Sequence, residues 1–226
     1  MELGGTFCRP FADLKNRLPS IKAYIFDWDG VFNDGVKSSQ GGSLFSEVDA
    51  MGTNMLRFGH WLSHGQLPRV AIITGEENPA AQHLAQREKF DAIYSKCSNK
   101  LIAFDHFLKT YALHEEEVAF VFDDVLDLAV ADRCGLRCMV KHHASPMLQQ
   151  YVMLENQAEY ISSGHAHGVR EICELILSAN KKYDEAVSLR SAFAPAYQNY
   201  LQERQRTNVK NFVLKEGKIE EHGKTD

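Results

Sequence analysis

Two aspartates separated by a single residue follow a short apolar run near the start of the chain. The segment from Ala23 to Gly30 reads Ala-Tyr-Ile-Phe-Asp-Trp-Asp-Gly. A short apolar run that ends at a glycine predicts a buried strand followed by a loop. Because alternate residues of an extended chain point the same way, we expect Asp27 and Asp29 to face one site and Trp28 to face away. Two carboxylates this close need a cation or a shared proton between them, which indicates a metal site with one carboxylate free to attack or to transfer a proton.

Two other interpretations of this motif must be weighed. Calcium-binding loops also begin Asp-x-Asp-Gly, but they continue with oxygen ligands at alternate positions and close with a glutamate. Here the next residues are Val31 and Phe32, which excludes a calcium loop. A solvated Asp-Gly turn fits poorly behind the apolar residues Tyr24 to Phe26, yet the motif alone does not decide between a turn and a metal site.

Two later positions carry groups that could bind a phosphate. A second apolar run ends in Thr74 and Gly75, and a hydroxyl followed by glycine ahead of a helix can hold a phosphate oxygen with its side chain and backbone N–H. Lys100 follows Asn99 at a predicted helix N-terminus, where a cation opposes the helix dipole, and a residue that breaks a local rule is a candidate for function. An ordinary strand exit and a solvated surface lysine are the alternatives that these residues leave open.

Three aspartates follow the most apolar stretch of the chain, Val118–Phe122. They are Asp123, Asp124 and Asp127. Acidic residues in a first helical turn are ordinary caps. Beside the pair at the first strand, however, three more carboxylates are electrostatically costly without a cation. Oxygen ligands with no histidine or cysteine beside them favour Mg²⁺ over Zn²⁺.

Alternating strand-like and helix-like stretches would position these groups. The expected strands cover residues 24–27, 70–74, 92–94, 118–122 and 136–140, and the expected helices cover 50–63, 79–89, 100–111 and 169–179. We expect Asn78 and Asn99 to be the N-caps of two of these helices. Such alternation predicts an α/β fold with a parallel sheet covered on both faces. Ligands of such sheets bind beyond the carboxyl ends of the strands.

Two further segments have their own character. Residues 31–48 are expected to form a β-hairpin with its turn at 40–42, directly after the first strand. Apolar residues at three- and four-residue spacing after residue 180 predict two short amphipathic helices, and from about Gln205 the composition is typical of a disordered polar tail. We therefore expect a main domain over 1–180, a helical extension over 181–206 and a tail over 207–226.

Composition limits the classes of protein that the chain can represent. It has 226 residues and a formal net charge of −5, with no dense basic stripe, which argues against nucleic acid as its main partner. No apolar stretch approaches membrane-spanning length, and the first residues do not form an export signal. Five scattered cysteines without a Cys-x-x-Cys pair predict reduced thiols in a cytoplasmic protein.

In chain order, Asp-x-Asp-Gly, Thr-Gly, Lys100 and the Asp-Asp-x-x-Asp that starts at Asp123 resemble the haloacid dehalogenase (HAD) superfamily of phosphohydrolases. The run Asp29–Gly35, the hairpin after it and the segment Gly168–Leu177 look like the branch of 3-deoxy-D-manno-octulosonate 8-phosphate phosphatases. The resemblance covers about residues 21–177. It implies a HAD-type, Rossmann-like doubly wound sheet without a large cap domain, and a hairpin flap after the first strand.

The resemblance also implies roles for these residues in hydrolysing a small phosphorylated sugar acid. Asp27 would attack phosphorus and form an aspartyl-phosphate. Asp29 would protonate the leaving sugar oxygen and later activate water. Thr74, with Gly75, and Lys100 would hold the transferring phosphoryl oxygens.

A magnesium ion and a homotetramer belong to the same implied picture. Asp27, the backbone carbonyl of Asp29 and the side chain of Asp123 would hold Mg²⁺, while Asp124 and Asp127 would support the metal site. In the family the hairpins assemble a tetramer, and neighbouring subunits help to enclose the pocket.

The chain departs from the family pattern at several positions. Phe122 replaces the usual glycine, which either shifts the metal loop or packs into the core. Glu76 follows Thr-Gly where arginine is common, and residues 164–168 replace a glycine-rich segment. His142, His143, His165 and His167 are read as solvated loop histidines rather than a second metal site.

Two alternatives to the sugar acid phosphatase therefore remain. The chain could be a catalytically silent relative retained for binding or assembly, or a phosphatase of another small phosphomonoester.

Overall fold

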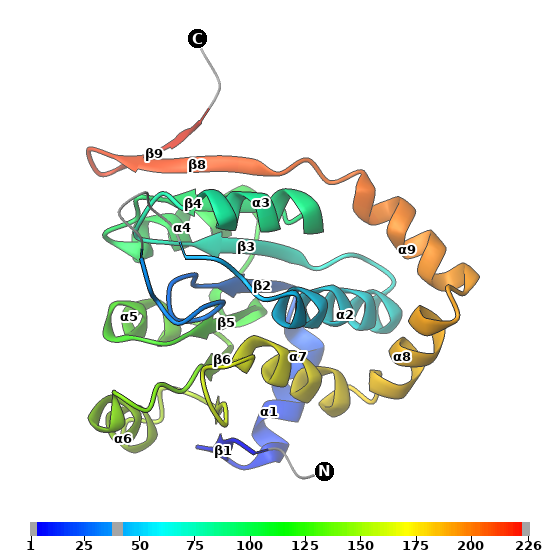
Figure 1. The fold of residues 1–226 in the computed structure, drawn as a ribbon, viewed down its shortest axis with the longest axis horizontal. Coiled ribbons are helices and arrows are strands. Elements are labelled where there is room, and N and C mark those ends of the chain that lie inside the picture. Colours follow the sequence, from blue (N-terminus) through cyan, green and yellow to red (C-terminus); the bar gives the residue numbers. More distant parts are fainter. Residues whose placement is uncertain (1–3, 38–42, 223–226) are drawn as a thin grey trace.

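A computed structural model describes residues 4–37 and 43–222, and within them nine strands form one sheet (Figure 1). The spatial order is β1-β7-β6-β5-β2-β3-β4-β8-β9, so β2 lies at the centre. The strands are β1 (Thr6–Phe7), β2 (Ala23–Phe26), β3 (Arg69–Ile73), β4 (Ala92–Ser95), β5 (Val118–Phe122), β6 (Leu136–Met139), β7 (Tyr160–Ile161), β8 (Lys210–Lys215) and β9 (Lys218–Glu221).

Helices connect the strands and cover the sheet. The α-helices are α1 (Phe11–Arg17), α2 (Glu47–His64), α3 (Pro79–Glu88), α4 (Lys100–Tyr111), α5 (Leu128–Ala131), α6 (Pro146–Leu154), α7 (Gly168–Ala179), α8 (Tyr183–Ser191) and α9 (Pro195–Gln205). Three short 3₁₀ helices are η1 (Leu18–Ser20), η2 (Glu115–Glu117) and η3 (Val125–Asp127). No helix in the described part of the chain is both long and apolar enough to cross a membrane.

The seven strands from β7 to β8 pair in parallel, and only the two edge strands β1 and β9 pair antiparallel. Phe26 of β2 lies opposite Ile72 of β3 and Val121 of β5. The carboxyl ends of these three strands therefore meet at one edge of the sheet. The predicted α/β fold with a mostly parallel sheet is confirmed.

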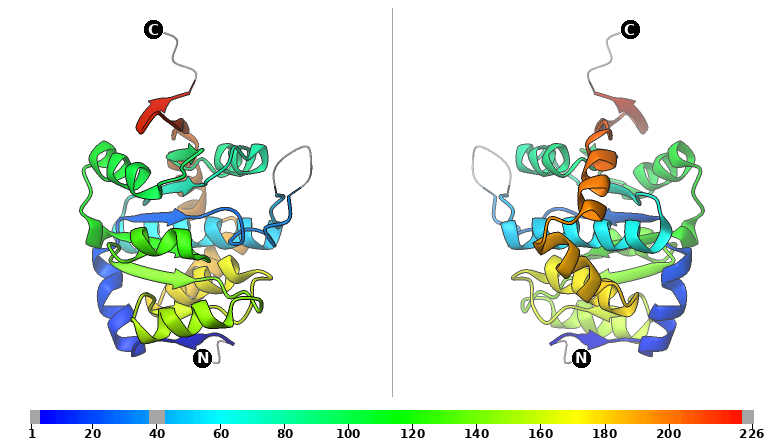
Figure 2. Two further views of the ribbon diagram at one scale, coloured as in Figure 1. Left: turned by 90° about the vertical axis from the view of Figure 1, so that its left-hand side faces the viewer. Right: turned by 90° about the vertical axis from the view of Figure 1, so that its right-hand side faces the viewer.

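Two apolar layers enclose the sheet, so it is doubly wound (Figure 2). Helices α1, α2, α3 and α7 pack on one face, and α4, α5 and α6 pack on the other. Side chains of β2 alternate between the layers, with Tyr24 and Phe26 in the first and Ala23 and Ile25 in the second. The next residue, Asp27, thus continues on the side of α4.

The predicted β-hairpin after β2 is not observed. Its turn lies outside the described residues, and residues 31–37 and 43–46, which we call the flap loop, contain no strand. The backbone N–H groups of Val31 and Phe32 both donate to the Trp28 carbonyl, which makes a turn instead. Phe32 and Phe45 then pack on the buried Trp28 ring. Aromatic packing onto the core therefore holds the flap loop, instead of the hydrogen bonds between two strands that the prediction required.

The C-terminal region differs most from prediction. The two expected helices exist as α8 and α9, and they pack against α2. The polar tail is not disordered in its described part, because β8 pairs in parallel with β4 and β9 folds back on β8. Elements β1, α1, α6 and β7 were not predicted at all. The proposed domain boundaries at 180 and 206 stay a prediction.

A buried ion pair connects the end of α9 to the end of α3. Arg204 Nη1 lies 2.8 Å from Glu88 Oε2 at the end of α3, and both side chains are about nine-tenths buried. Asn54 Nδ2 of α2 donates to the same oxygen at 2.9 Å. The extension and the helices over the sheet thus share one network.

We expect Arg204→Ala to lower the free energy of unfolding by about 2 kcal/mol, because it removes one of the two arginines that pair with the buried Glu88 carboxylate and leaves only Arg87, whose Nε lies 3.2 Å from Oε1. Denaturant titration measures the change. Lys215→Ala is the matched control, since its ion pair with Glu220 is more than half exposed and should change stability by less than about 1 kcal/mol. Equal small effects would show that the extension is not fastened by Glu88.

Candidate active site

A buried lysine joins two carboxylates at the carboxyl edge of the sheet. Lys100 Nζ lies 2.5 Å from Asp27 Oδ1 and 2.5 Å from Asp127 Oδ1. Its side chain is only 7 % exposed, so the solvated surface lysine is excluded. Lys100 is the first residue of α4, which Asn99 caps by accepting from the Leu101 N–H, as predicted. The cap fixes the first residue of the helix, and this position brings the Lys100 ammonium group to Asp27.

Three carboxylates form one acidic cluster. Oxygens of Asp27, Asp123 and Asp127 all lie within 4.8 Å of one another. Asp123 Oδ1 is buried and has no hydrogen-bond partner among the described residues. One lysine leaves this cluster with excess negative charge, and an unpartnered carboxylate oxygen is a ready ligand. The donor set of oxygens alone fits a hard divalent cation such as Mg²⁺.

The charges of the cluster alter the pKa of its members. Burial, followed by the charge of Asp127, raises the pKa of Asp27 well above the usual range, while Lys100 opposes that rise. Burial likewise raises the pKa of Asp127. Although burial opposes it, the two carboxylates raise the pKa of Lys100, so this lysine stays protonated. The cluster is therefore strained by unscreened negative charge.

Asp29 lies beside the cluster rather than in it. Its Oδ1 accepts from Ser43 Oγ at 2.9 Å, and its Oδ2 accepts from Asn78 Nδ2 at 3.2 Å and lies 3.4 Å from Lys37 Nζ. These partners come from the flap loop and the start of α3. The two aspartates thus have different surroundings, and any role of Asp29 in holding a metal falls to its backbone carbonyl, as the resemblance implies.

Thr74 and Gly75 end β3 next to Asp29. Thr74 is fully buried, and its Oγ1 accepts from the backbone N–H of Glu76 at 3.3 Å. Asn78 stands at the N-cap position of α3, as predicted, but its side chain makes no capping hydrogen bond, and its Nδ2 instead approaches Thr74 Oγ1 at 3.4 Å. A Cβ atom added at Gly75 would meet nothing within 4 Å. Space for a ligand therefore adjoins Thr74.

The aspartates after β5 divide into two kinds. Asp123 and Asp127 belong to the cluster, whereas Asp124 is exposed and accepts from the Val125 N–H at 2.7 Å as the cap of η3. Phe122 is completely buried and stacks on Phe120, with ring centroids 5.8 Å apart. Of the two expectations for Phe122, packing into the core is the observed one.

His142 is a site residue that the sequence analysis missed. Its Nε2 lies 2.8 Å from the Gly30 carbonyl oxygen and 3.3 Å from Asp123 Oδ2. The hydrogen bond to Asp123 raises the pKa of His142. The sequence feature that could have identified His142 is its position just after β6, because the carboxyl ends of the parallel strands lie at the same edge of the sheet. The reading of His142 as a solvated loop histidine was wrong.

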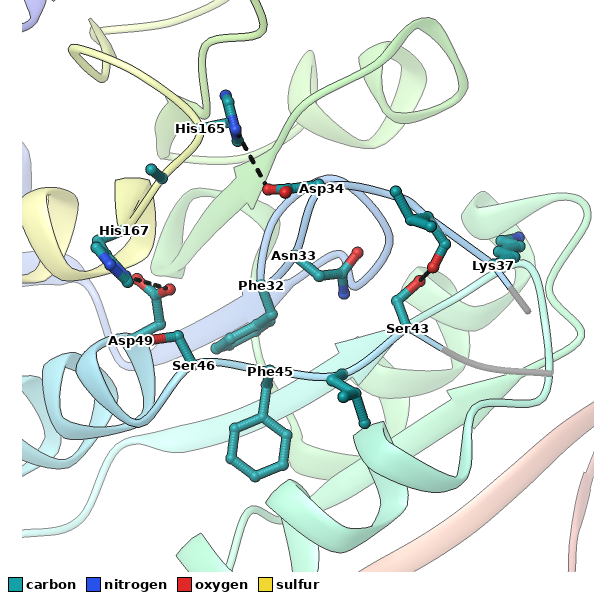
Figure 3. A pocket seen from close by; sticks show the side chains of 13 residues that line it. Phe32, Asn33, Asp34, Lys37, Ser43, Phe45, Ser46, Asp49, His165 and His167 are labelled. Atoms are coloured by element: carbon teal, nitrogen blue, oxygen red, sulfur yellow. Dashed lines mark hydrogen bonds and ion pairs between the residues drawn. The ribbon is translucent and has the colours of Figure 1, made fainter. Parts of the chain in front are cut away.

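A pocket of about 780 Å³ adjoins Asp29 between the flap loop and residues 165–167 (Figure 3). Lys37 and Ser43, which contact Asp29, are among its lining residues. On the far side, His165 pairs with Asp34 at 3.2 Å and His167 with Asp49 at 3.4 Å. Polar groups and the exposed apolar flap residues thus share one cavity.

Comparisons with known proteins identify the family. No protein-family model matches the chain. The 3-deoxy-D-manno-octulosonate 8-phosphate phosphatase KdsC of Escherichia coli (strain K12) is 33% identical over 179 residues, which cover 77% of this chain and 89% of that protein. The chain belongs to this phosphatase family. The KdsC of Yersinia pestis is 32% identical over 183 residues, covering 78% of this chain and 90% of that protein.

Solved structures of the KdsC family agree with this fold. The crystal structure of the Yersinia pestis phosphatase has a TM-score of 0.62 at 30% identity and covers 76% of this chain and 89% of its own. A probable yrbi family phosphatase from Pseudomonas syringae has a TM-score of 0.65 at 31% identity, covering 79% of this chain and 97% of its own. KdsC proteins are phosphoric monoester hydrolases of the HAD superfamily. The acidic cluster at the carboxyl edge of the sheet is therefore the candidate active site.

We expect Mg²⁺ to stabilise the protein more as pH rises. The pKa of Asp27 and of Asp127 is raised in the folded state, so their contribution to stability is present below the ordinary carboxyl value of 3.8 and is lost as pH rises through the raised values. A bound cation offsets this loss and at about 100 times its Kd adds about 2.7 kcal/mol. Denaturant titrations in EDTA and in Mg²⁺ across this range measure the difference.

Asp127→Asn should reduce the pH dependence of that difference, whereas Asp132→Asn, at an exposed position of the same region, should not. A Mg²⁺ effect that is the same at every pH would contradict the account of the cluster.

Proposed function

We propose that the protein is a Mg²⁺-dependent phosphatase that hydrolyses 3-deoxy-D-manno-octulosonate 8-phosphate or a related 2-keto-3-deoxy sugar acid phosphate. The observation that carries the proposal is the pair of unequal aspartates at one strand end. Asp27 is buried against Lys100 in the acidic cluster, and Asp29 lies beside it, next to the pocket. Membership of the KdsC family supports the substrate class.

The residues divide the reaction into two steps. An oxygen of Asp27 attacks phosphorus, the bond from phosphorus to the sugar oxygen breaks, and Asp29 donates a proton to that oxygen. Asp29 then takes a proton from water, whose oxygen attacks phosphorus and releases Asp27 and inorganic phosphate. Thr74 and Lys100 bind the phosphoryl oxygens.

Asp27, Asp123 and the backbone carbonyl of Asp29 would hold the Mg²⁺ ion, with Asp127 beside them. Bound Mg²⁺ supplies positive charge against the negative charge of the phosphoryl group. Lys100 lowers the pKa of Asp27 against the larger effect of burial, and the charge of Mg²⁺ would lower it further toward the ionised carboxylate that attack requires. Lys37 and Ser43, which line the pocket, both contact the Asp29 carboxylate.

The sugar acid occupies the pocket that adjoins Asp29. Lys37 is the one lysine or arginine among the residues that line the described pocket, and it provides a cation for the carboxylate of the substrate. Five free thiols in the described residues are typical of the reducing cytoplasm, which is the location we propose.

Phosphate release from a panel of compounds tests the proposal. We expect Mg²⁺-dependent release from 2-keto-3-deoxy sugar acid phosphates of eight or nine carbons, and much less from hexose phosphates and nucleotides. Asp27→Asn should lower kcat by about 10⁴-fold or more. Asp29→Asn should lower it by about 10²- to 10⁴-fold. Asp132→Asn, at an exposed position, should leave kcat unchanged.

Three outcomes would overturn parts of this proposal. Comparable release by Asp27→Asn would exclude the aspartyl-phosphate. Preference for a hexose phosphate or a nucleotide would assign another small phosphomonoester as the substrate. No release from any compound by a protein that binds Mg²⁺ would favour a catalytically silent protein retained for binding or assembly.

We also propose a homotetramer assembled through the flap loop. Val36 is 75% exposed and Leu44 is 81% exposed on this loop, and exposed apolar groups that gather in one place favour contact with another protein surface. Sedimentation velocity should show a tetramer for the wild type and smaller species for Leu44→Asp. Leu154→Asp, at an exposed position of α6, is the control that should remain tetrameric. A monomeric wild type would exclude the assembly.

A further inference from the structure

The loop after β6 holds His142 firmly over the edge of the sheet. The backbone carbonyl of His142 accepts from the Ser145 N–H at 3.1 Å and from Gln149 Nε2 at 2.6 Å. One residue earlier, the Lys141 N–H donates to Ser162 Oγ at 3.0 Å. The backbone that carries the imidazole is therefore held by contacts outside the flap loop.

The contacts of the ring decide which nitrogen carries hydrogen. A carbonyl oxygen only accepts, so the 2.8 Å contact of His142 Nε2 with the Gly30 carbonyl requires hydrogen on Nε2. The same N–H faces Asp123 Oδ2 at 3.3 Å. The Nε2–H group of His142 thus lies between the Gly30 carbonyl, in the loop after β2, and the Asp123 carboxylate, which follows β5.

The Asp123 carboxylate is confined on its Oδ2 side. A Cβ atom at Gly30 would lie 2.0 Å from Oδ2, so only a glycine allows this approach, and Gly30 also has a φ of +90°. Oδ2 is thereby enclosed by Gly30 and His142. Oδ1 is buried and has no partner in the described structure, so it is the Asp123 oxygen with free capacity to bind a cation.

We propose that His142 is a positioning residue that orients Asp123, so that Oδ1 rather than Oδ2 is presented to the divalent cation. The inference rests on the metal site of the proposed function and adds a residue to it. A hydrogen bond to the outer oxygen of a ligating carboxylate fixes its rotation and raises the metal affinity. His142 itself touches neither the cation nor the substrate.

A second histidine supports the ring from the pocket side. His165 lies nearly parallel to His142, with an interplanar angle of 12° and ring centroids 5.5 Å apart. His165 in turn pairs with Asp34 of the flap loop at 3.2 Å. The stack limits the tilt of His142 away from Asp123.

Direct binding of Mn²⁺, measured by electron paramagnetic resonance without substrate, tests this role. We expect His142→Ala to weaken Mn²⁺ binding by about 10- to 100-fold. His142→Gln, whose side-chain amide nitrogen can donate from nearly the same place, should recover most of the affinity. His143→Ala is the matched control, because the adjacent His143 is exposed and makes no contact with Asp123.

Two further measurements separate positioning from a general structural role. Thermal unfolding in EDTA should be nearly the same for the wild type and His142→Gln, and kcat of His142→Ala should recover at high Mg²⁺ concentration while KM for the substrate changes little. Equal Mn²⁺ affinity of the wild type and His142→Ala would overturn the role of His142. Absence of saturable Mn²⁺ binding by the wild type would overturn the metal site of the proposed function as well.

Discussion

The buried bridge from Lys100 to Asp27 and Asp127 is the interaction on which the site depends. An ammonium group removed from water is costly unless close opposite charges compensate it, and here two carboxylates lie 2.5 Å away. In return, the lysine is the one cation that the described residues place in contact with Asp27, where burial otherwise opposes ionisation. The start of α4, the end of β2 and η3 must therefore keep their relative positions, because moving any of them leaves a buried charge unpaired.

This constraint explains why much of the site could be predicted from the sequence. Adjacent parallel strands end together, so Asp27, Thr74 and Asp123 had to meet once β2 was known to lie between β3 and β5. The alternation of β2 side chains sends Asp27 to the side of α4, where Lys100 begins the helix. Ser43 and Lys37 could not be found in this way, because they reach Asp29 from the flap loop, whose path depends on tertiary packing.

The parts of the fold that the sequence analysis predicted wrongly differ for physical reasons. Residues 31–48 looked like a hairpin because their sequence offers a turn at 40–42, but Phe32 and Phe45 pack on Trp28, and the described residues of the flap loop form no strand. The tail looked disordered because β8 and β9 carry lysine and glutamate on their exposed edges. Its signal was the Glu216-Gly217 turn, where both residues have positive φ as in a tight hairpin turn. Pairing with β4, far away in the sequence, then supplies the stability that local composition lacks.

The unequal surroundings of Asp27 and Asp29 give the pair its chemical meaning. Asp27 is held by Lys100 at the start of α4, which suits the proposed nucleophile because such an atom must attack along one line. Asp29 is held by Ser43 and Lys37 of the flap loop, and Ser43 adjoins the exposed Leu44. A contact that orders Leu44 therefore also fixes the donor to Asp29. In the proposed mechanism the flap loop therefore links the outer surface of the molecule to Asp29, which transfers protons, while the nucleophile Asp27 is held by β2, α4 and η3.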